Sequence, residues 1–344
     1  MSLKLGILDQ SPVFPESSAE EALKETVSLA QKAEEWGYSR FWVSEHHHSQ
    51  DVAGSSPEVL ISYLAAKTES IRVGSGGVML QHYSPYKVAE NFNLLSSLAP
   101  GRIDLGIGKA PGGLPLSTKA LQFGTVNDGK DFDERLSLLK RLVDDSVPVG
   151  HPLAGIQATP LPPEKPEIFL LGASPNSAKL AASLGVGFVF ALFINNNREI
   201  LGEASREYRR LLPGGNFIAA AHVLAAPTQE EAEKLAADQK IVKVRLQDGR
   251  SVTVVTVEQA RSFGEQAGIP YEIEEQQANI IAGTPEYVTG ILRELHQAHQ
   301  IDEFILHTAL PRAKERIRSF ELLSPQSRNA HIGKEEQESN FQSV

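Results

Sequence analysis

The chain has no cysteine and no excess of positive charge, and these two absences exclude several classes of function. Without cysteine there are no disulfide bonds, no thiolate metal sites and no cysteine nucleophile, so a disulfide-stapled extracellular scaffold is not expected. The formal net charge is −10, with 43 Asp and Glu against 33 Lys and Arg. Because nucleic-acid binding depends on clustered Lys and Arg, we expect a small molecule or a protein as partner rather than a nucleic acid.

The chain also lacks a long hydrophobic run. Its most apolar stretch, residues 184–194, has about eleven residues, which is short of the roughly twenty needed to cross a bilayer. This stretch is typical of a buried strand. Residues 1–8 alternate like a strand and lack the basic and apolar regions of a secretory signal. We therefore expect no membrane segment and a location in the cytoplasm.

Strand-like and helix-like patterns alternate along the chain, which indicates parallel βαβ units. In the first unit Leu3, Leu5 and Ile7 follow a period of two, and a capping box at Ser18 and Glu21 then opens a helix. The pattern predicts eight strands, at residues 3–8, 40–44, 71–80, 103–107, 167–171, 187–191, 217–225 and 303–307. Eight such units predict a closed (β/α)8 TIM barrel.

One barrel domain covers residues 1–323 in this interpretation. A doubly wound open sheet is the alternative, but such a sheet usually carries a glycine-rich phosphate loop after its first strand, where this chain has DQSP at residues 9–12. Residues 238–282 are an insertion between strands seven and eight, in which Asp248-Gly249 predicts a hairpin turn. We expect this insertion to cover the barrel mouth or to contact a partner subunit. The polar tail, residues 324–344, is expected to fray.

A run of histidines follows the second strand, at the end of the strand where barrel enzymes place their catalytic groups. Residues 44–48 read SEHHH. Three interpretations remain open for such a run: a solvated polar loop, a metal site completed by ligands from elsewhere, or one imidazole that faces the cavity and transfers protons. The position at a strand end favours the third interpretation.

Three other strand ends have unusual sequences. Residues 74–77, GSGG, interrupt an apolar run, and glycine there marks either a kink or the close approach of something flat to the backbone. Residues 106–113, GIGKAPGG, match neither a Walker loop nor a dinucleotide fingerprint, although Lys109 could hold a phosphate or form a Schiff base. Ser174, ahead of Pro175, either caps its own helix or helps to bind an anion at the start of that helix.

Taken together, these segments resemble the bacterial-luciferase-like flavin monooxygenases. Four motifs at successive strand ends and one later motif carry the resemblance: FWVSEHH at 41–47, IRVGSGG at 71–77, GRIDLGIGK at 101–109, GASP at 172–175 and GTPE at 283–286. The similarity extends from the first strand to about residue 310. It implies a TIM barrel with an insertion, FMN as the cofactor and a homodimer. It implies no metal ion.

The resemblance also implies roles for residues near the flavin ring. His46 matches the active-site histidine of the family, and its neighbour Glu45 is a second catalytic candidate. Gly76 and Gly77 match a non-proline cis peptide on which the flavin ring rests. Gly108 stands where the luciferase itself carries a reactive cysteine, so light emission is not a safe inference.

A second set of residues is implied to bind the phosphate of FMN. Ala173, Ser174 and Ser177 match the helix start that contacts the phosphate, and Lys109 replaces a phosphate-binding arginine. Lysine keeps the positive charge but loses the bidentate fork of arginine, so we expect the phosphate to be held more loosely or in a different orientation.

From the resemblance we expect a two-component monooxygenase that uses O2 to oxygenate a small organic substrate. The chain has no dinucleotide fingerprint, so reduced FMN is expected from a separate NAD(P)H-dependent reductase. Two alternatives remain: a deazaflavin-dependent oxidoreductase that transfers hydride, and a barrel that binds flavin without catalysis. Aldehydes, sulfonates and polyketide-like compounds all remain open as substrates. We expect the pocket wall to include Asp9, Gln10, His82, Tyr83 and Phe193.

Overall fold

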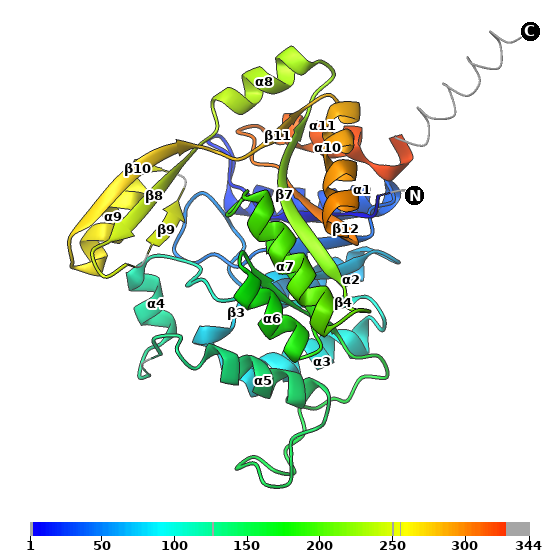
Figure 1. Ribbon diagram of the computed structural model, residues 1–344, viewed down its shortest axis with the longest axis vertical. Coiled ribbons are helices and arrows are strands. Elements are labelled where there is room, and N and C mark those ends of the chain that lie inside the picture. Colours follow the sequence, from blue (N-terminus) through cyan, green and yellow to red (C-terminus); the bar gives the residue numbers. More distant parts are fainter. Residues whose placement is uncertain (1–2, 126, 250, 255, 328–344) are drawn as a thin grey trace, which may run out of the picture.

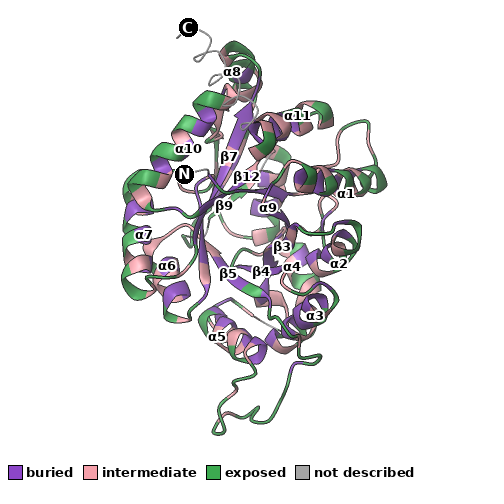
Figure 2. Ribbon diagram, turned by 90° about the vertical axis from the view of Figure 1, so that its right-hand side faces the viewer, coloured by how far each residue is buried: buried purple, intermediate pink, exposed green. Residues whose placement is uncertain are grey.

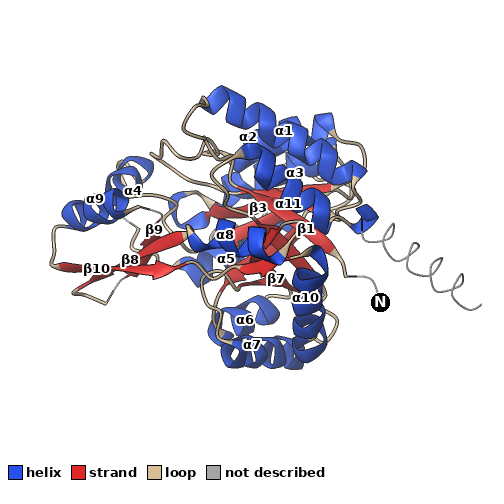
Figure 3. Cartoon of the chain, turned by 90° about the horizontal axis from the view of Figure 1, so that it is seen from above, coloured by secondary structure: helices blue, strands red, loops and turns tan. Residues whose placement is uncertain are grey.

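Eight parallel strands pair into a closed barrel, which lies at the centre of the molecule (Figure 1 and Figure 3). The computed structural model describes residues 3–327 apart from 126, 250 and 255. The barrel strands are β1 (Leu5–Asp9), β2 (Arg40–Val43), β3 (Arg72–Met79), β4 (Ile103–Gly108), β5 (Glu167–Gly172), β6 (Gly187–Ala191), β7 (Phe217–Ala225) and β12 (Glu303–His307). They pair in this order, and β12 pairs with both β7 and β1, which closes the ring. The predicted TIM barrel is confirmed, and the alternative prediction of a doubly wound open sheet is wrong.

Helices follow the strands, and most of them cover the outside of the barrel, with their exposed residues facing outward in Figure 2. They are α1 (Ala19–Glu35), α2 (Pro57–Lys67), α3 (Pro85–Leu98), α4 (Pro115–Leu121), α5 (Phe132–Val143), α6 (Pro175–Ser183), α7 (Arg198–Leu211), α8 (Gln229–Ala237), α10 (Pro285–His299) and α11 (Ala313–Leu323), with a short 3-10 helix, η1 (Leu80–His82). The predicted capping box of Ser18 and Glu21 opens α1. Over the described part of the chain, every helix is too short or too polar to cross a membrane.

The insertion between β7 and β12 is a small structure of its own beside the barrel (Figure 1). Its strands β8 (Lys240–Leu246), β9 (Ser251–Val254) and β10 (Tyr271–Gln277) form an antiparallel sheet in the order β10-β8-β9, and α9 (Val257–Ala267) packs on it. The predicted hairpin is present as β8 and β9. Helix α9 and strand β10 were not predicted. The chain then returns through β11 (Ile281–Gly283), which pairs with β7.

The barrel interior has two layers below its mouth. At the end where the strands begin, the Arg40 guanidinium is 2% exposed and donates to Asp104 at 2.8 Å and to Glu303 at 2.9 Å. Above this ionic layer lies an apolar cluster made of Leu8, Trp42, Phe169, Val189, Ile218, Ala220 and Ile305. Because these layers fill the interior, a ligand within the described part of the barrel would bind at the mouth, at the carboxyl ends of the strands. Most of the predicted polar tail, residues 328–344, lies outside the described residues.

Candidate active site

His46 lies at the barrel mouth, just after β2. Its Nε2 atom is 3.3 Å from the side-chain amide nitrogen of Gln10, which follows β1. Its backbone N–H donates to the carbonyl of Gly54 at 2.8 Å, and this bond fixes the loop. Burial lowers the pKa of His46, and the neighbouring His47 acts in the same direction. The ring is therefore neutral near pH 7 and is able to accept a proton.

The side chain of Glu45 contacts His47, Tyr83 and the backbone of Met79. Its carboxylate is 1% exposed and lies 2.7 Å from Nε2 of His47. It accepts the Tyr83 hydroxyl at 2.7 Å and the backbone N–H of Met79 at 3.0 Å. Glu45 therefore ties the end of β3 and the Tyr83 hydroxyl to the histidine loop.

The peptide bond between Gly76 and Gly77 is cis, as the resemblance implies. It lies near the end of β3, where the register with β4 shifts between Ser75 and Val78. A Cβ atom on Gly77 would lie 2.7 Å from the carbonyl oxygen of Gly106, so a side chain there would collide with the backbone of β4. The sequence therefore leaves bare backbone at this part of the mouth, against which a flat ring could lie.

The start of α6 has the composition of an anion site. Ser174 is its N-cap, and the backbone N–H of Ser177 donates to the Ser174 hydroxyl oxygen at 3.3 Å. The two hydroxyl oxygens are 3.1 Å apart, and no acidic residue stands in the first turn. The carbonyl oxygen of Ala173, just before the cap, accepts the side-chain N–H of Asn195 at 3.0 Å. A phosphate here would meet two hydroxyls and the positive end of the helix dipole.

Lys109 directly follows β4, and its side chain lies over α5. Its side chain is exposed, and its Nζ atom lies 5.4 Å from the centre of the Phe132 ring on α5. No hydrogen bond joins Lys109 to Ser174 or Ser177 in the part of the chain that the structure describes.

A cavity of about 260 Å³ lies between the barrel mouth and the insertion. Gln10, His46 and His47 line it from the barrel, and Val252, Val254 and Phe263 line it from β9 and α9. Two glutamines join the insertion to the barrel: Gln259 donates to the Asp51 carboxylate at 2.7 Å, and Gln266 accepts the backbone N–H of Leu116 at 2.9 Å. The insertion therefore covers part of the mouth, which was one of the two expected roles.

The predicted pocket wall needs correction at Asp9. This carboxylate is fully buried, pairs with Arg316 on α11 and accepts the Thr26 hydroxyl at 2.6 Å, so it cannot face a substrate. Tyr83 is held by Glu45, and His82 is 2.8 Å from the carbonyl oxygen of Pro111. Within the described residues, no three His, Asp or Glu side chains converge as a metal site.

Two histidines at the barrel mouth were not predicted from the sequence as candidate site residues. His222 on β7 and His307 on β12 lie opposite each other in register, with ring centres 5.1 Å apart. The ring of Phe193 is 6.2 Å from that of His307. The available signal was their position near the carboxyl ends of predicted strands, but a histidine inside an apolar run also fits an ordinary core position.

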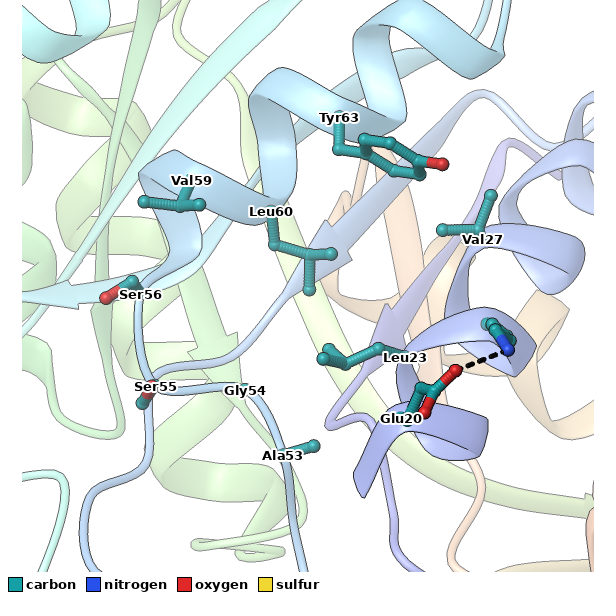
Figure 4. A pocket seen from close by; sticks show the side chains of 11 residues that line it. Glu20, Leu23, Val27, Ala53, Gly54, Ser55, Ser56, Val59, Leu60 and Tyr63 are labelled. Atoms are coloured by element: carbon teal, nitrogen blue, oxygen red, sulfur yellow. Dashed lines mark hydrogen bonds and ion pairs between the residues drawn. The ribbon is translucent and has the colours of Figure 1, made fainter. Parts of the chain in front are cut away.

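A second cavity, of about 530 Å³, is a groove between α1 and α2 on the outside of the barrel (Figure 4). Leu23, Leu60 and Tyr63 give it an apolar surface. Its two charged side chains, Glu20 and Lys24, pair with each other at 2.6 Å. The groove lacks the histidines of the mouth, so we assign it no part in the chemistry.

Comparisons with known proteins agree with this geometry. A family model described as luciferase-like monooxygenase matches residues 3–299. An N-acetyl-S-alkylcysteine monooxygenase of Bacillus subtilis is 50% identical over 325 residues, which are 94% of this chain and 97% of that protein. The solved structure of apo-MsnO8 is similar with a TM-score of 0.75 and 32% identity, over 94% of this chain and 97% of that one.

A second solved structure shares the fold at lower identity. It is the oxygenating constituent of 3,6-diketocamphane monooxygenase from the CAM plasmid of Pseudomonas putida, in complex with FMN. Its TM-score is 0.67 at 19% identity, over 95% of this chain and 98% of that one, which shows the barrel fold alone. On the family model and the 50% identical relative together, this chain is an enzyme of the luciferase-like monooxygenase family.

Proposed function

We propose that the protein is an FMN-dependent monooxygenase that receives reduced flavin from a separate reductase and oxygenates a small organic substrate. The observation that carries the proposal is the arrangement of the mouth. The neutral imidazole of His46, the bare backbone of Gly76 and Gly77 and the serine-capped start of α6 all lie at the carboxyl ends of the barrel strands. A flavin mononucleotide has a flat ring and a phosphate, which match the second and third of these features.

Several residues of the chain would bind the phosphate of FMN. Ser174 and Ser177 would bind the phosphate with the backbone at Ala173, and Lys109 would supply a positive charge. When bound, reduced FMN would supply the two electrons that allow one atom of O2 to enter the substrate while the other leaves as water. The relative that is 50% identical is named a monooxygenase, and this supports FMN over a deazaflavin, which transfers hydride and does not activate O2.

His46 would transfer the proton in the reaction. Burial keeps its ring neutral, so it is ready to accept a proton at neutral pH, and Gln10 holds the ring from one side. Glu45 would act indirectly, because it fixes His47 and the end of β3. The insertion would exclude water from the reacting atoms with the apolar side chains of Val252 and Val254.

For the substrate we propose an N-acylated, S-alkylated derivative of cysteine. The relative that is 50% identical over nearly the whole chain is named for this class of compound. The cavity also fits it, because a volume of about 260 Å³ with an apolar roof suits an alkyl group next to a polar head. Aldehydes, sulfonates and polyketides have no comparable support.

We further propose that the enzyme is a homodimer. The outer faces of the adjacent helices α2 and α3 expose Val59, Tyr63, Leu94 and Leu98 by 68, 54, 50 and 67%. The groove of Figure 4 continues this apolar surface along α2. A second copy of the chain would bury it. Analytical ultracentrifugation over a range of concentrations tests this, and a chain that stays monomeric throughout contradicts it.

The main experiment measures oxygen transfer directly. The full chain is supplied with FMN, NADH, a flavin reductase, N-acetyl-S-methylcysteine and isotopically labelled O2, and the product is analysed by mass spectrometry. We expect one labelled oxygen atom per product molecule. His46→Ala should lower turnover about 100-fold or more, whereas His151→Ala, on a distant loop, should not. A chain that fails to bind FMN, or that oxidises reduced FMN without labelling any product, refutes the proposal.

A further inference from the structure

His222 and His307 are not used by the proposed chemistry, yet they face the same barrel mouth. Ile218 and Ala220 on β7 and Ile305 on β12 belong to the apolar cluster inside the barrel. Because strand side chains alternate with a period of two, His222 and His307 continue the same inward-facing columns toward the carboxyl ends. Their ring centres are 5.1 Å apart.

Among the residues that the structure describes, neither ring has a carboxylate partner that would keep it charged. Burial lowers the pKa of His222 to about 4. Burial also holds the pKa of His307 well below its ordinary value, and the charges of His222, Arg316 and His46 act in the same direction. Both rings are therefore neutral near pH 7, and they interact through hydrogen bonds rather than through charge.

The hydrogen bonds of the two rings are incomplete. The backbone N–H of Ala309 donates to Nε2 of His222 at 3.2 Å, so this nitrogen is the acceptor and the ring proton is on Nδ1. The Nδ1 atom of His307 is buried and has no hydrogen-bond partner among the described residues. A buried polar atom without a partner costs about 1–3 kcal/mol, so its presence calls for a ligand or an ordered water.

The mouth has two chemically different sides. The ends of β3, β4 and β5 are rich in glycine and lead to the serine-capped start of α6, which suits the flavin. The ends of β7, β12, β1 and β2, which are consecutive around the ring, carry an arc of polar side chains. These side chains are His222, His307, Gln10 and His46.

We propose that His222 and His307 bind the polar head of the organic substrate through an oxygen acceptor, a carbonyl or a carboxylate. The proton on Nδ1 of His222 would donate to this oxygen, and His307, with its own ring proton on Nδ1, would donate the second hydrogen bond. The inference deepens the proposed function, on which it rests for the substrate class, since an N-acylated amino acid carries both kinds of oxygen. It assigns the polar head to the side of the mouth at the ends of β7 and β12. It assigns the alkyl group to the cavity roofed by Val252 and Val254, which Gln10 and His46 of the same arc also line.

Steady-state kinetics with N-acetyl-S-methylcysteine and two pairs of variants test the assignment. His222→Phe and His307→Phe keep a flat ring and remove the hydrogen bond, and each should raise KM about tenfold, as expected for one lost hydrogen bond. His222→Gln restores an N–H donor, so its KM should return most of the way to the wild-type value. This variant also tests the hydrogen bond if His222→Phe does not fold. The Kd of FMN, measured by quenching of flavin fluorescence, should stay within about twofold of the wild type.

A second measurement does not depend on turnover. The protein with histidines labelled by ¹³C is loaded with oxidised FMN and titrated with the same compound, while the imidazole signals are followed by NMR. The signals of His222 and His307, assigned with the variants, should shift, whereas that of His151 should not. In one outcome the wild type forms labelled product, while the Phe variants keep the wild-type KM and the compound leaves these signals unshifted. In that case the assignment is wrong and the proposed function stands.

Two other outcomes also overturn the assignment. If the Phe variants weaken FMN binding tenfold with KM unchanged, the pair holds the flavin and not the substrate. If the compound is neither turned over nor able to shift the two signals, both the assignment and the proposed substrate class fail. Shifted signals without turnover support binding by the pair and reject only the proposed reaction.

Discussion

Replacing His222 by glutamine should make the folded protein less sensitive to acid. In the wild type, burial lowers the pKa of His222 from its ordinary 6.5 to about 4. Because the folded chain holds the ring neutral, the unfolded chain binds the proton first as the pH falls. The sign follows from linkage: the contribution of the neutral ring to stability is complete above about pH 6.5 and is lost as the pH falls toward about 4.

The size of the effect follows from the same two values. The full difference between 6.5 and about 4 corresponds to about 3 kcal/mol, and at about pH 5 the loss reaches about 2 kcal/mol. For a chain of 344 residues, with an unfolding entropy of about 2.1 cal/mol/K per residue, this loss lowers Tm by about 3 °C. The glutamine side chain does not titrate, so the His222→Gln variant escapes this part of the acid destabilisation.

The assay compares thermal unfolding of the two chains at about pH 7.5 and about pH 5. Groups that titrate in both chains cancel when the change in Tm of the variant is subtracted from that of the wild type. The wild type should lose about 3 °C more than His222→Gln. His151→Gln, on an outer loop, should behave as the wild type does. Equal losses in the wild type and in His222→Gln would show that the ring is not held neutral by the fold.

Three further predictions follow from other contacts. Glu45→Gln should lower kcat about tenfold with the Kd of FMN kept, because the amide holds His47 less firmly than the carboxylate does; full turnover contradicts the positioning role. Ser174→Ala should cost about 1 kcal/mol of stability and weaken FMN binding, so an unchanged Tm and an unchanged Kd would reject the cap. Gly77→Ala should destabilise the fold by about 3 kcal/mol, while Gly150→Ala, which has open space around its new Cβ, should leave Tm unchanged.

The sequence predicted the barrel strands well because their signals are local. Strands β6, β7 and β12 begin and end at the predicted residues, since each is a short apolar run between turn residues. Strand β10 was missed because YEIEEQQ is largely charged and polar. Its strand conformation comes from pairing with β8, in which Tyr271 lies opposite Leu246, and a pattern in one segment cannot show that partner.

The candidate site was predictable only in part. His46, Gly76, Gly77 and the cap at Ser174 belong to motifs that can be read along the chain, and the structure puts them at strand ends. The partner of Asp9 is Arg316, which is 307 residues away, so the burial of this carboxylate was invisible in the sequence. The histidine pair on β7 and β12 was hidden for the same reason, because closure of the ring brings it next to β1 and β2.

The closing strand β12 also has a consequence for how the protein is made. During synthesis β1 leaves the ribosome early, but its neighbour β12 begins at residue 303, after the whole insertion has been made. Until then β1 and β7 are both open sheet edges, which are prone to pair with other chains. A nascent chain stalled within the insertion would lack His307 and would expose both edges. We therefore expect the synthesis of β12, rather than folding of the first units, to set the moment at which the mouth is assembled.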